Sequence, residues 1–324
     1  MNAPLIVILG PTASGKSCLA IHLARDFRGE VVNCDSVQVY KYLNIGTSKL
    51  TKPEQAGIPH HVMDMFEPDQ LFTAGEYLGL GRKALVEIGQ RNHLPLIVGG
   101  TGFYLRVLLD GLFEGPKRSE GLRKRLNSLA ERKGSLHLHR LLERVDAASA
   151  RKIAINDKPK IVRALEVFLL TTKPLSWHFR SGRDPLEGFR ILKIGLNPPR
   201  PFLYELIDRR VDKMFADGLI DEVQWLLSRG FSADLKPLQS LGYFRVGQLL
   251  RGQISLSEAV ALTKRDTRHY AKRQLTWFRR ENGVVWFDSV GNDPLLQSHV
   301  GAKVAHFLKQ LSLEVLEAPL PRRM

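Results

Sequence analysis

Cysteine and long apolar runs are both scarce in this chain of 324 residues. Its two cysteines, Cys18 and Cys34, form no C-x-x-C pair, and its ten histidines show no metal-ligand spacing, so we expect no structural zinc site. No apolar run approaches the roughly 20 residues that span a bilayer. The N-terminal apolar run lacks a basic region and a small-residue cleavage site, so it does not resemble a signal peptide. We therefore expect a cytoplasmic protein with reduced cysteines and no membrane partner.

Acidic residues are also in short supply. The chain has 33 Asp and Glu against 48 Lys and Arg, which gives a formal net charge of +15. Such an excess is typical of proteins that bind a polyanion, most often nucleic acid. A basic surface that serves only solubility is the alternative interpretation.

Apolar runs alternate with helical patterns along most of the chain. Short apolar or β-branched runs predict buried strands at 5–9, 30–34, 94–98, 190–196 and 284–287. Spacing of three and four residues predicts helices at 15–26, 73–91, 120–133 and 158–170. Strands that alternate with helices predict an α/β fold, in which helices flank a parallel sheet.

A basic, mostly helical stretch interrupts this alternation. Residues 114–190 hold 18 Lys and Arg against 9 Asp and Glu, so they carry 9 of the chain's 15 excess positive charges. We interpret the stretch as an insertion domain that binds RNA. The last residues show no periodicity and predict a disordered tail. The predicted order is an α/β core at 1–115, a basic helical insertion domain at 116–189, a second part of the core at 190–313, and the tail at 314–324.

Residues 10–17 read Gly-Pro-Thr-Ala-Ser-Gly-Lys-Ser and fit the P-loop pattern G-x-x-x-x-G-K-[ST]. They follow a predicted strand and open a predicted helix, which is the context that the pattern requires. Glycines let backbone N–H groups face an anion, and the helix dipole adds to the attraction. Lys16 supplies a positive charge, and the Ser17 hydroxyl can ligate Mg²⁺. The predicted diphosphate-binding residues are Gly10, Pro11, Thr12, Ala13, Ser14, Gly15, Lys16 and Ser17.

Polar residues follow the second predicted strand. Because ligands of parallel sheets bind beyond the carboxyl ends of the strands, we expect Asp35 to lie near the P-loop. A carboxylate there can hold a metal or accept a proton. Gln38 has a side chain that can pair with an adenine edge. The alternatives are a helix cap for Asp35 and a surface amide for Gln38.

The third predicted strand runs into Gly99-Gly100-Thr101 without an acidic residue at its end. An ATPase usually has an aspartate at such a position to hold Mg²⁺. Its absence disfavours ATP hydrolysis. Thr101 either faces the ligand crevice or caps the helix that follows.

Residues 263–280 combine seven Lys and Arg with one acid. Ala271, Leu275 and Phe278 mark a buried stripe. The stretch is either a helix that contacts phosphates or a solvated cationic face. The cations that recur at helical spacing are Arg265, Arg268, Lys272 and Arg279.

Together these segments resemble the tRNA dimethylallyltransferase (tRNA isopentenyltransferase) family, in its bacterial form. The motifs occur in the family's order from about residue 5 to residue 288. From the two cysteines we expect no zinc-finger extension of the kind that eukaryotic members have. Besides 10–17, the matching stretches are Asp-Ser-Val-Gln-Val-Tyr at 35–40, Asn-Ile-Gly-Thr-Ser-Lys at 44–49, Gly-Ile-Pro-His-His at 57–61, Val-Gly-Gly-Thr-Gly-Phe-Tyr-Leu at 98–105, Arg-Ala-Leu-Glu-Val at 163–167, Leu-Gly-Tyr at 241–243 and Tyr-Ala-Lys-Arg-Gln-Leu-Thr-Trp-Phe-Arg at 270–279.

The resemblance implies transfer of a dimethylallyl group from dimethylallyl diphosphate to N6 of the adenosine 3′-adjacent to the anticodon in tRNA, giving N6-isopentenyladenosine. It implies Mg²⁺, a P-loop NTPase-like core, and the tRNA anticodon stem-loop as partner; we expect a monomer. The implied catalytic residues are Asp35 as general base, Thr101 and Lys16. The implied tRNA contacts are Asp35, Ser36, Val37, Gln38, Thr101, Arg123, Pro159, Lys160, Ile161, Val162 and Arg163. The family often has Met at position 37 and usually Gln at position 162, where this chain has valines.

Two other functions compete with prenyl transfer. A P-loop small-molecule kinase using ATP would account for residues 10–17 but not for the basic insert. A non-catalytic RNA-binding module would account for the charge but would leave the P-loop and Asp35 without a role. Prenyl transfer uses all three features, because a diphosphate leaves, a weakly nucleophilic amine needs a base, and the acceptor is RNA.

Overall fold

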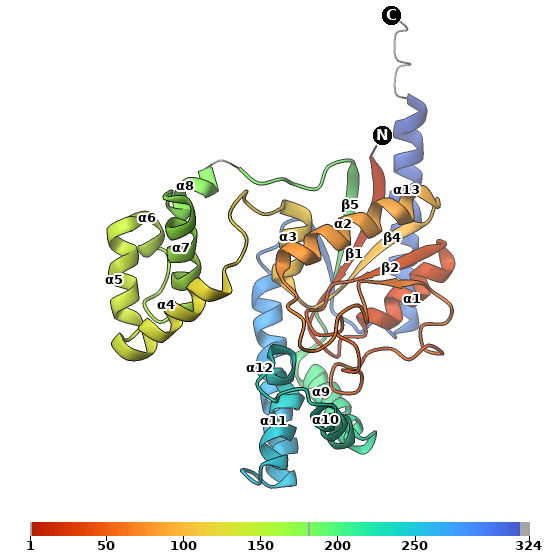
Figure 1. The fold of residues 1–324 in the computed structure, drawn as a ribbon. Helices are drawn as coiled ribbons and strands as arrows, with labels where there is room; N and C mark the ends of the chain where they lie inside the picture. Colours follow the sequence, from red (N-terminus) through yellow and green to blue (C-terminus); the bar gives the residue numbers. More distant parts are fainter. Residues whose placement is uncertain (1, 181, 318–324) are drawn as a thin grey trace, which may run out of the picture. The chain divides into compact units, whose positions relative to one another are not determined.

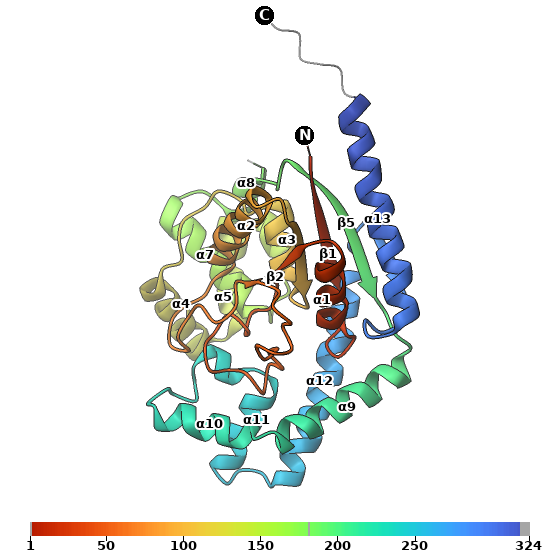
Figure 2. The ribbon, with the colours of Figure 1, turned by 90° about the vertical axis from the view of Figure 1, so that its right-hand side faces the viewer.

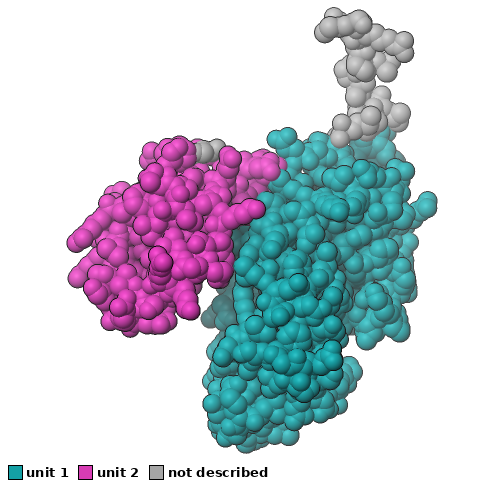
Figure 3. Space-filling model, in the orientation of Figure 1, with its two compact units in different colours: residues 1–108, 186–324 teal, residues 109–185 magenta. Residues whose placement is uncertain are grey.

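The computed structural model describes residues 2–180 and 182–317, which form two compact units (Figure 3). The second unit is Leu109–Pro185, and the first comprises the described residues on either side of it. Both boundaries of the second unit lie before those expected from sequence, 116 and 189. One reason is that His178 Nδ1 hydrogen-bonds the Glu114 carbonyl at 2.9 Å, which ties the segment before residue 116 to this unit.

Within residues 2–180 and 182–317, six parallel strands form one sheet in the order β3-β2-β4-β1-β5-β6 (Figure 1). The predicted parallel α/β sheet is therefore confirmed. Only β3 was missed, because two residues carry no periodicity. The strands are β1 (Ala3–Leu9), β2 (Gly29–Asn33), β3 (His60–His61), β4 (Leu94–Gly99), β5 (Phe189–Leu196) and β6 (Val284–Phe287).

Helices cover both faces of the sheet (Figure 2). Alternate side chains of a strand point to opposite faces. Ile6 and Ile8 of β1 therefore share one apolar cluster with Leu19 of α1 and Val300 of α13. On the other face α2 packs on β2 and β4, and its Tyr77 ring stacks on Tyr104 of α3. These helices are α1 (Lys16–Asp26), α2 (Ala74–Gln90), α3 (Gly102–Asp110) and α13 (Pro294–Glu317).

The rest of the first unit is helical and is organised around the long helix α12, which packs against α9 and α11. Ala271 and Phe278 of α12 are buried as predicted, and Leu275 is half-buried. No described helix is long and apolar enough to cross a membrane. These elements are α9 (Arg200–Ala216), α10 (Leu219–Ser228), the 3-10 helix η1 (Lys236–Gln239), α11 (Leu241–Leu250) and α12 (Leu256–Phe278).

The chain end differs from the expected tail. Helix α13 continues through Glu317, so the tail predicted from residue 314 was wrong for its first four positions. Residues 318–324, which carry the rest of that prediction, lie outside the described residues.

The second unit is helical, as expected. Leu138 and Leu142 of α5 and Ile161 and Leu165 of α7 form the centre of its apolar core. Apolar residues three and four apart place each helix's buried stripe toward that core. Its helices are α4 (Glu120–Lys133), α5 (Ser135–Val145), α6 (Ala147–Ala150), α7 (Lys158–Thr171) and α8 (Leu175–Arg180).

Candidate active site

A cleft of about 830 Å³ lies in the first unit, beyond the carboxyl ends of β1, β2 and β4. The chain segments that leave these three strands form one wall, and parts of α9 and α12 form another. Parallel strands end at the same edge of a sheet, so residues far apart in sequence meet there. The predicted residues that line the cleft are Thr12, Ala13, Gly15, Lys16, Ser17, Asp35, Ser36, Val37 and Gln38. The remaining P-loop residues, Gly10, Pro11 and Ser14, are buried.

The P-loop is held in shape by close backbone packing and by local hydrogen bonds. Gly15 has φ 82°, and a Cβ there would lie 2.7 Å from the backbone nitrogen of Gly291, so the position requires glycine. The Ser14 hydroxyl and the Lys16 ammonium both donate to the Pro11 carbonyl, at 2.8 and 2.7 Å. These contacts draw Lys16 back over the loop at the start of α1.

Lys16 is poised to change its charge near neutral pH. Burial lowers the pKa of its ammonium, the positive charge of Arg210 lowers it as well, and the nearby Asp35 opposes both; together these effects bring the pKa to about 7. A bound diphosphate would favour the charged ammonium, because an opposite charge raises the pKa of a lysine.

We expect the protein to take up a proton when inorganic diphosphate binds at pH 8. Free Lys16 is mostly neutral there because its pKa is about 7, and the bound anion restores the ammonium. Titration calorimetry in two buffers of different ionisation enthalpy measures the number of protons. Lys16→Met is the control, because it removes this proton but not those of the ligand. Equal proton numbers for the wild type and Lys16→Met would contradict the assignment.

Asp35 lies in a tight turn at the end of β2. Its Oδ1 accepts hydrogen bonds from the backbone nitrogens of Val37 at 2.8 Å and Gln38 at 3.3 Å. The Gln38 side-chain amide in turn donates to the Thr47 carbonyl at 3.0 Å. Asp35 therefore caps a turn rather than a helix, and both side chains face the cleft instead of the outer surface.

Thr101 braces this turn from the neighbouring strand. Its backbone nitrogen donates to the Cys34 carbonyl at 3.1 Å, and its hydroxyl accepts from the Ser36 nitrogen at 3.2 Å. Tyr270 of α12 also hydrogen-bonds the Thr101 side chain, and burial raises the pKa of Tyr270. Thr101 thus fixes the backbone on either side of Asp35.

Sequence reasoning missed two residues that organise the cleft. Gln274 of α12 accepts from the Thr12 nitrogen at 2.8 Å and donates to the Gly100 carbonyl at 2.9 Å, which joins the P-loop to the turn after β4. Its place between Ala271 and Phe278 on the buried stripe was a usable signal. Arg210 of α9 also lines the cleft, and burial lowers the pKa of its guanidinium against the influence of Asp35. Nothing in the sequence around Arg210 distinguished it from other surface arginines.

In the second unit, the two arginines expected to contact tRNA are engaged with one buried acid. Glu166 is 0% exposed. Arg123 donates to both of its carboxylate oxygens at 2.9 Å, and Arg163 donates to Oε2 at 2.7 Å. Hydrogen bonds from these arginines offset burial and lower the pKa of Glu166. Arg123 therefore links α4 to α7, while Arg163 pairs with Glu166 within α7, whatever else the two arginines contact.

The predicted tRNA contacts in residues 159–163 include both exposed and buried residues. Pro159 and Lys160 are exposed at the start of α7. Ile161 and Val162 are 0% and 2% exposed, so their side chains belong to the core of the unit. The helical repeat turns these two positions into the core, and it gives Val162 an apolar role where the family usually has Gln.

We expect Arg123→Ala to destabilise the second unit by on the order of 3 kcal/mol, because it leaves one side of a buried carboxylate uncompensated. Lys124→Ala is the matched control: it removes the same charge from the exposed neighbour on the same helix. Chemical denaturation followed by circular dichroism measures both. Equal stabilities of the two variants would contradict a structural role for Arg123.

The sequence matches the family described as IPP transferase over residues 38–281, and it also matches the isopentenyl transferase family over residues 3–63. The chain belongs to the IPP transferase family. It is 52% identical over 308 residues to the tRNA dimethylallyltransferase of Solibacter usitatus, covering 95% of this chain and 100% of that protein. It is 50% identical over 294 residues to that of Koribacter versatilis, covering 90% and 95%.

Two solved structures of the family share the fold. The tRNA isopentenylpyrophosphate transferase from Bacillus halodurans is 36% identical with a TM-score of 0.71, covering 95% of this chain and 98% of that one. A eukaryotic dimethylallyltransferase acting on tRNA is 27% identical with a TM-score of 0.80, covering 99% and 82%. The resemblance seen in the motifs is confirmed, and the chain is a prenyltransferase. Nothing in these similarities favours the kinase.

Proposed function

We propose that the protein transfers a dimethylallyl group from dimethylallyl diphosphate to N6 of the adenosine 3′-adjacent to the anticodon in tRNA. The observation that carries this proposal is that the P-loop and the turn containing Asp35 line one cleft of about 830 Å³. Relatives that cover nearly the whole chain have the name tRNA dimethylallyltransferase. The cleft thus offers a diphosphate site and a carboxylate within one cavity.

The donor side of the cleft is cationic. Breaking the allylic C–O bond leaves negative charge on a diphosphate oxygen. Lys16, Arg210 and the N-terminus of α1 all line or open onto the cleft where that charge develops. Fixed positive groups in a partly desolvated site stabilise such charge without reorganising. We assign leaving-group stabilisation to these groups.

The acceptor side holds the base and the amide. The N6 lone pair of adenine is delocalised into the ring, so attack on the donor carbon needs close placement and removal of the N6 proton. We assign the proton to the Asp35 carboxylate, held by its turn, and recognition of the adenine edge to Gln38. The reacting base must leave the anticodon-loop stack to enter the cleft.

Mg²⁺ fits the residues on the donor side. The Ser17 hydroxyl lines the cleft beside Lys16, and magnesium prefers oxygen ligands while keeping several waters. Among residues 2–180 and 182–317, no group of three or more His, Cys, Asp or Glu is placed to hold a metal. We therefore propose that Ser17 would share the ion with the diphosphate. When bound, it would supply further charge neutralisation to the leaving group.

The exposed cations of the second unit suit the phosphates of the anticodon stem-loop. We expect Lys160→Ala to make the slope of log K for tRNA binding against log salt concentration shallower by nearly one unit. The reason is that a protein with one phosphate contact fewer releases one counterion fewer when it binds. Lys160 is exposed, so its loss should leave the fold intact. The measurement is tRNA Kd across a salt series, with inorganic diphosphate affinity as the control. An unchanged slope would remove Lys160 from the RNA surface.

The proposed function is tested by incubating the purified protein with dimethylallyl diphosphate and unmodified tRNA, and separately with ATP. We expect prenylated tRNA and negligible ATP hydrolysis, because β4 ends at Gly99 without an acidic residue. Robust ATP hydrolysis without tRNA, together with unmodified tRNA in the first reaction, would overturn the proposal.

A further inference from the structure

Glu222 of α10 accepts hydrogen bonds from three successive backbone nitrogens. Its Oε2 accepts from Asn44 at 3.0 Å and from Ile45 at 2.8 Å, and its Oε1 accepts from Gly46 at 3.3 Å. The Tyr243 hydroxyl of α11 donates to Oε1 at 2.5 Å. Successive N–H groups that converge on one point make an anion-binding concavity. Here the protein fills that concavity with its own carboxylate.

The segment that Glu222 holds runs directly into the cleft. The carbonyl of Thr47 accepts from the Gln38 amide at 3.0 Å and from Arg210 at 3.3 Å. The Ser48 hydroxyl accepts a second bond from Arg210 at 2.6 Å. One stretch of backbone therefore orients both the amide on the acceptor side and the guanidinium on the donor side.

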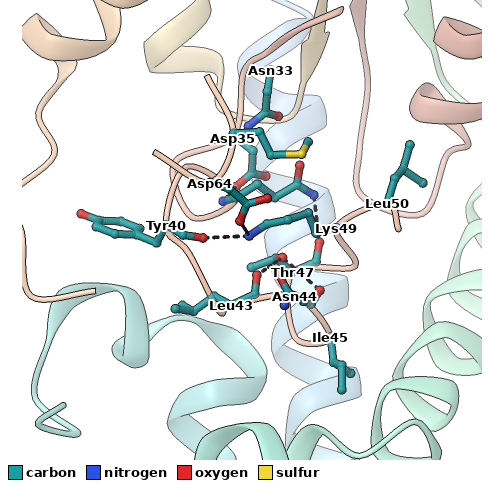
Figure 4. A network of polar contacts seen from close by, with 12 residues as sticks. Asn33, Asp35, Tyr40, Leu43, Asn44, Ile45, Thr47, Lys49, Leu50 and Asp64 are labelled. Atoms are coloured by element: carbon teal, nitrogen blue, oxygen red, sulfur yellow. Dashed lines mark hydrogen bonds and ion pairs between the residues drawn. The ribbon is translucent and has the colours of Figure 1, made fainter. Parts of the chain in front are cut away.

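The same segment has further anchors on its other side. Lys49 donates to the Tyr40 carbonyl at 2.7 Å and to Asp64 at 2.5 Å (Figure 4). The Thr47 hydroxyl donates to the Leu43 carbonyl at 2.7 Å. The nitrogens of residues 44–46 thus donate to Glu222, while the carbonyls of Asn44 and Ile45 accept from the nitrogens of Lys49 and Ser48.

Close packing against α11 restricts the backbone of residues 44–48 to one position. A Cβ on Gly46 would lie 2.4 Å from the ring of Tyr243, which shows how closely the backbone approaches α11. An amide at position 222 would place N–H donors against backbone N–H donors, and it would carry no charge. The geometry therefore requires a carboxylate rather than any polar group.

We propose that Glu222 is a positioning residue for prenyl transfer, which acts by fixing the 44–48 backbone that orients Gln38 and Arg210. This inference rests on the proposed function for its catalytic readout. Glu222 is absent from the described residues that line the cleft, so it acts through the backbone and touches neither substrate. Misplacement of a reacting group by about 1 Å can lower the reaction rate about 10²-fold. The loss of an anchor such as Glu222 should therefore be measurable in the rate, although Glu222 lies outside the cleft lining.

The first test compares Glu222→Gln with Asp221→Asn, which neutralises the exposed neighbouring acid on the same helix. In single-turnover reactions with excess enzyme, we expect Glu222→Gln to lower the rate constant roughly 10- to 100-fold with full amplitude. Asp221→Asn should keep the wild-type rate. A reduced amplitude with a wild-type rate constant would mean that Glu222 serves folding only, and it would overturn the proposal. Should Glu222→Gln fail to fold, Tyr243→Phe, which removes one hydrogen bond to the carboxylate, should lower the rate constant in the same way but less.

The second test is a double-mutant cycle with Gln38→Ala. If Glu222 acts through Gln38, then Glu222→Gln should have a markedly smaller effect in the Gln38→Ala background, because coupled residues are not additive. Strictly additive effects would overturn the proposal.

The third measurement is independent of transfer. Calorimetry should show weaker binding of inorganic diphosphate to Glu222→Gln, by about 3- to 10-fold, because Arg210 must then be ordered on binding. An enzyme that does not prenylate tRNA but shows this loss would contradict the proposed function and leave the positioning role intact. The opposite outcome is that the wild type prenylates tRNA while Glu222→Gln keeps the wild-type diphosphate affinity and rate. That outcome would support the proposed function and contradict the positioning role of Glu222.

Discussion

We expect Asp35→Asn to lower kcat by about 10²- to 10⁴-fold while the tRNA Kd stays within a few fold. Asparagine keeps the shape of the side chain and one oxygen that can accept from the Val37 nitrogen, now 2.8 Å from Oδ1. It cannot take the N6 proton. The turn at the end of β2 should therefore persist, and the loss should appear in the chemical step.

Single-turnover rates and tRNA binding, measured on the same preparations, separate these effects for Asp35→Asn. Asp69→Asn is the matched control, because Asp69 is an exposed acid in the same part of the chain. It should retain the wild-type rate. A near-normal rate in Asp35→Asn would make Asp35 a residue that only orders the turn, and the proton would then leave by another route.

We expect Lys16→Met to lower kcat by about 10²-fold or more, as for the loss of one charge contact to a transition state. The substitution keeps the length of the side chain but removes the ammonium near the leaving oxygen. Rapid-quench measurement of the transfer step checks the loss. A change confined to KM would show that Lys16 binds the donor equally in the ground state and the transition state.

The same substitution should change the pH dependence of stability. Lys16 has a pKa of about 7 in the folded protein against 10.5 for the free side chain. Between these values the unfolded chain binds more protons, so this group makes the free energy of unfolding rise with pH from about 7 to 10.5. Below pH 7 both states are protonated, and the buried ammonium lowers stability. Lys16→Met should remove this rise, and denaturation curves at pH 7 and pH 9 measure the difference. An identical rise in both proteins would assign it to other groups.

Much of the fold followed from local patterns. Every described strand except β3 coincides with an apolar or β-branched stretch, from Val31-Val32 in β2 to residues 5–9 in β1, and such stretches are visible in any sequence window. The P-loop at 10–17 and the turn after β2 were also accessible, because the end of a parallel strand fixes where the next residues lie. The boundaries of the second unit were less accessible, since they depend on contacts such as that between His178 and Glu114.

The sequence by itself determined that Lys16 and Asp35 line one cleft, because both follow strands whose ends must meet at one edge of the sheet. Only the tertiary structure decided which of the many polar residues support that chemistry. The family resemblance implied Arg123 and Arg163 as tRNA contacts, and the structure adds that both compensate the buried Glu166. Glu222 looked like an ordinary helical acid, yet it holds residues 44–46, which lie far from it in sequence. Charge and spacing describe what a side chain can do, but its partner is set by long-range packing, which no local pattern encodes.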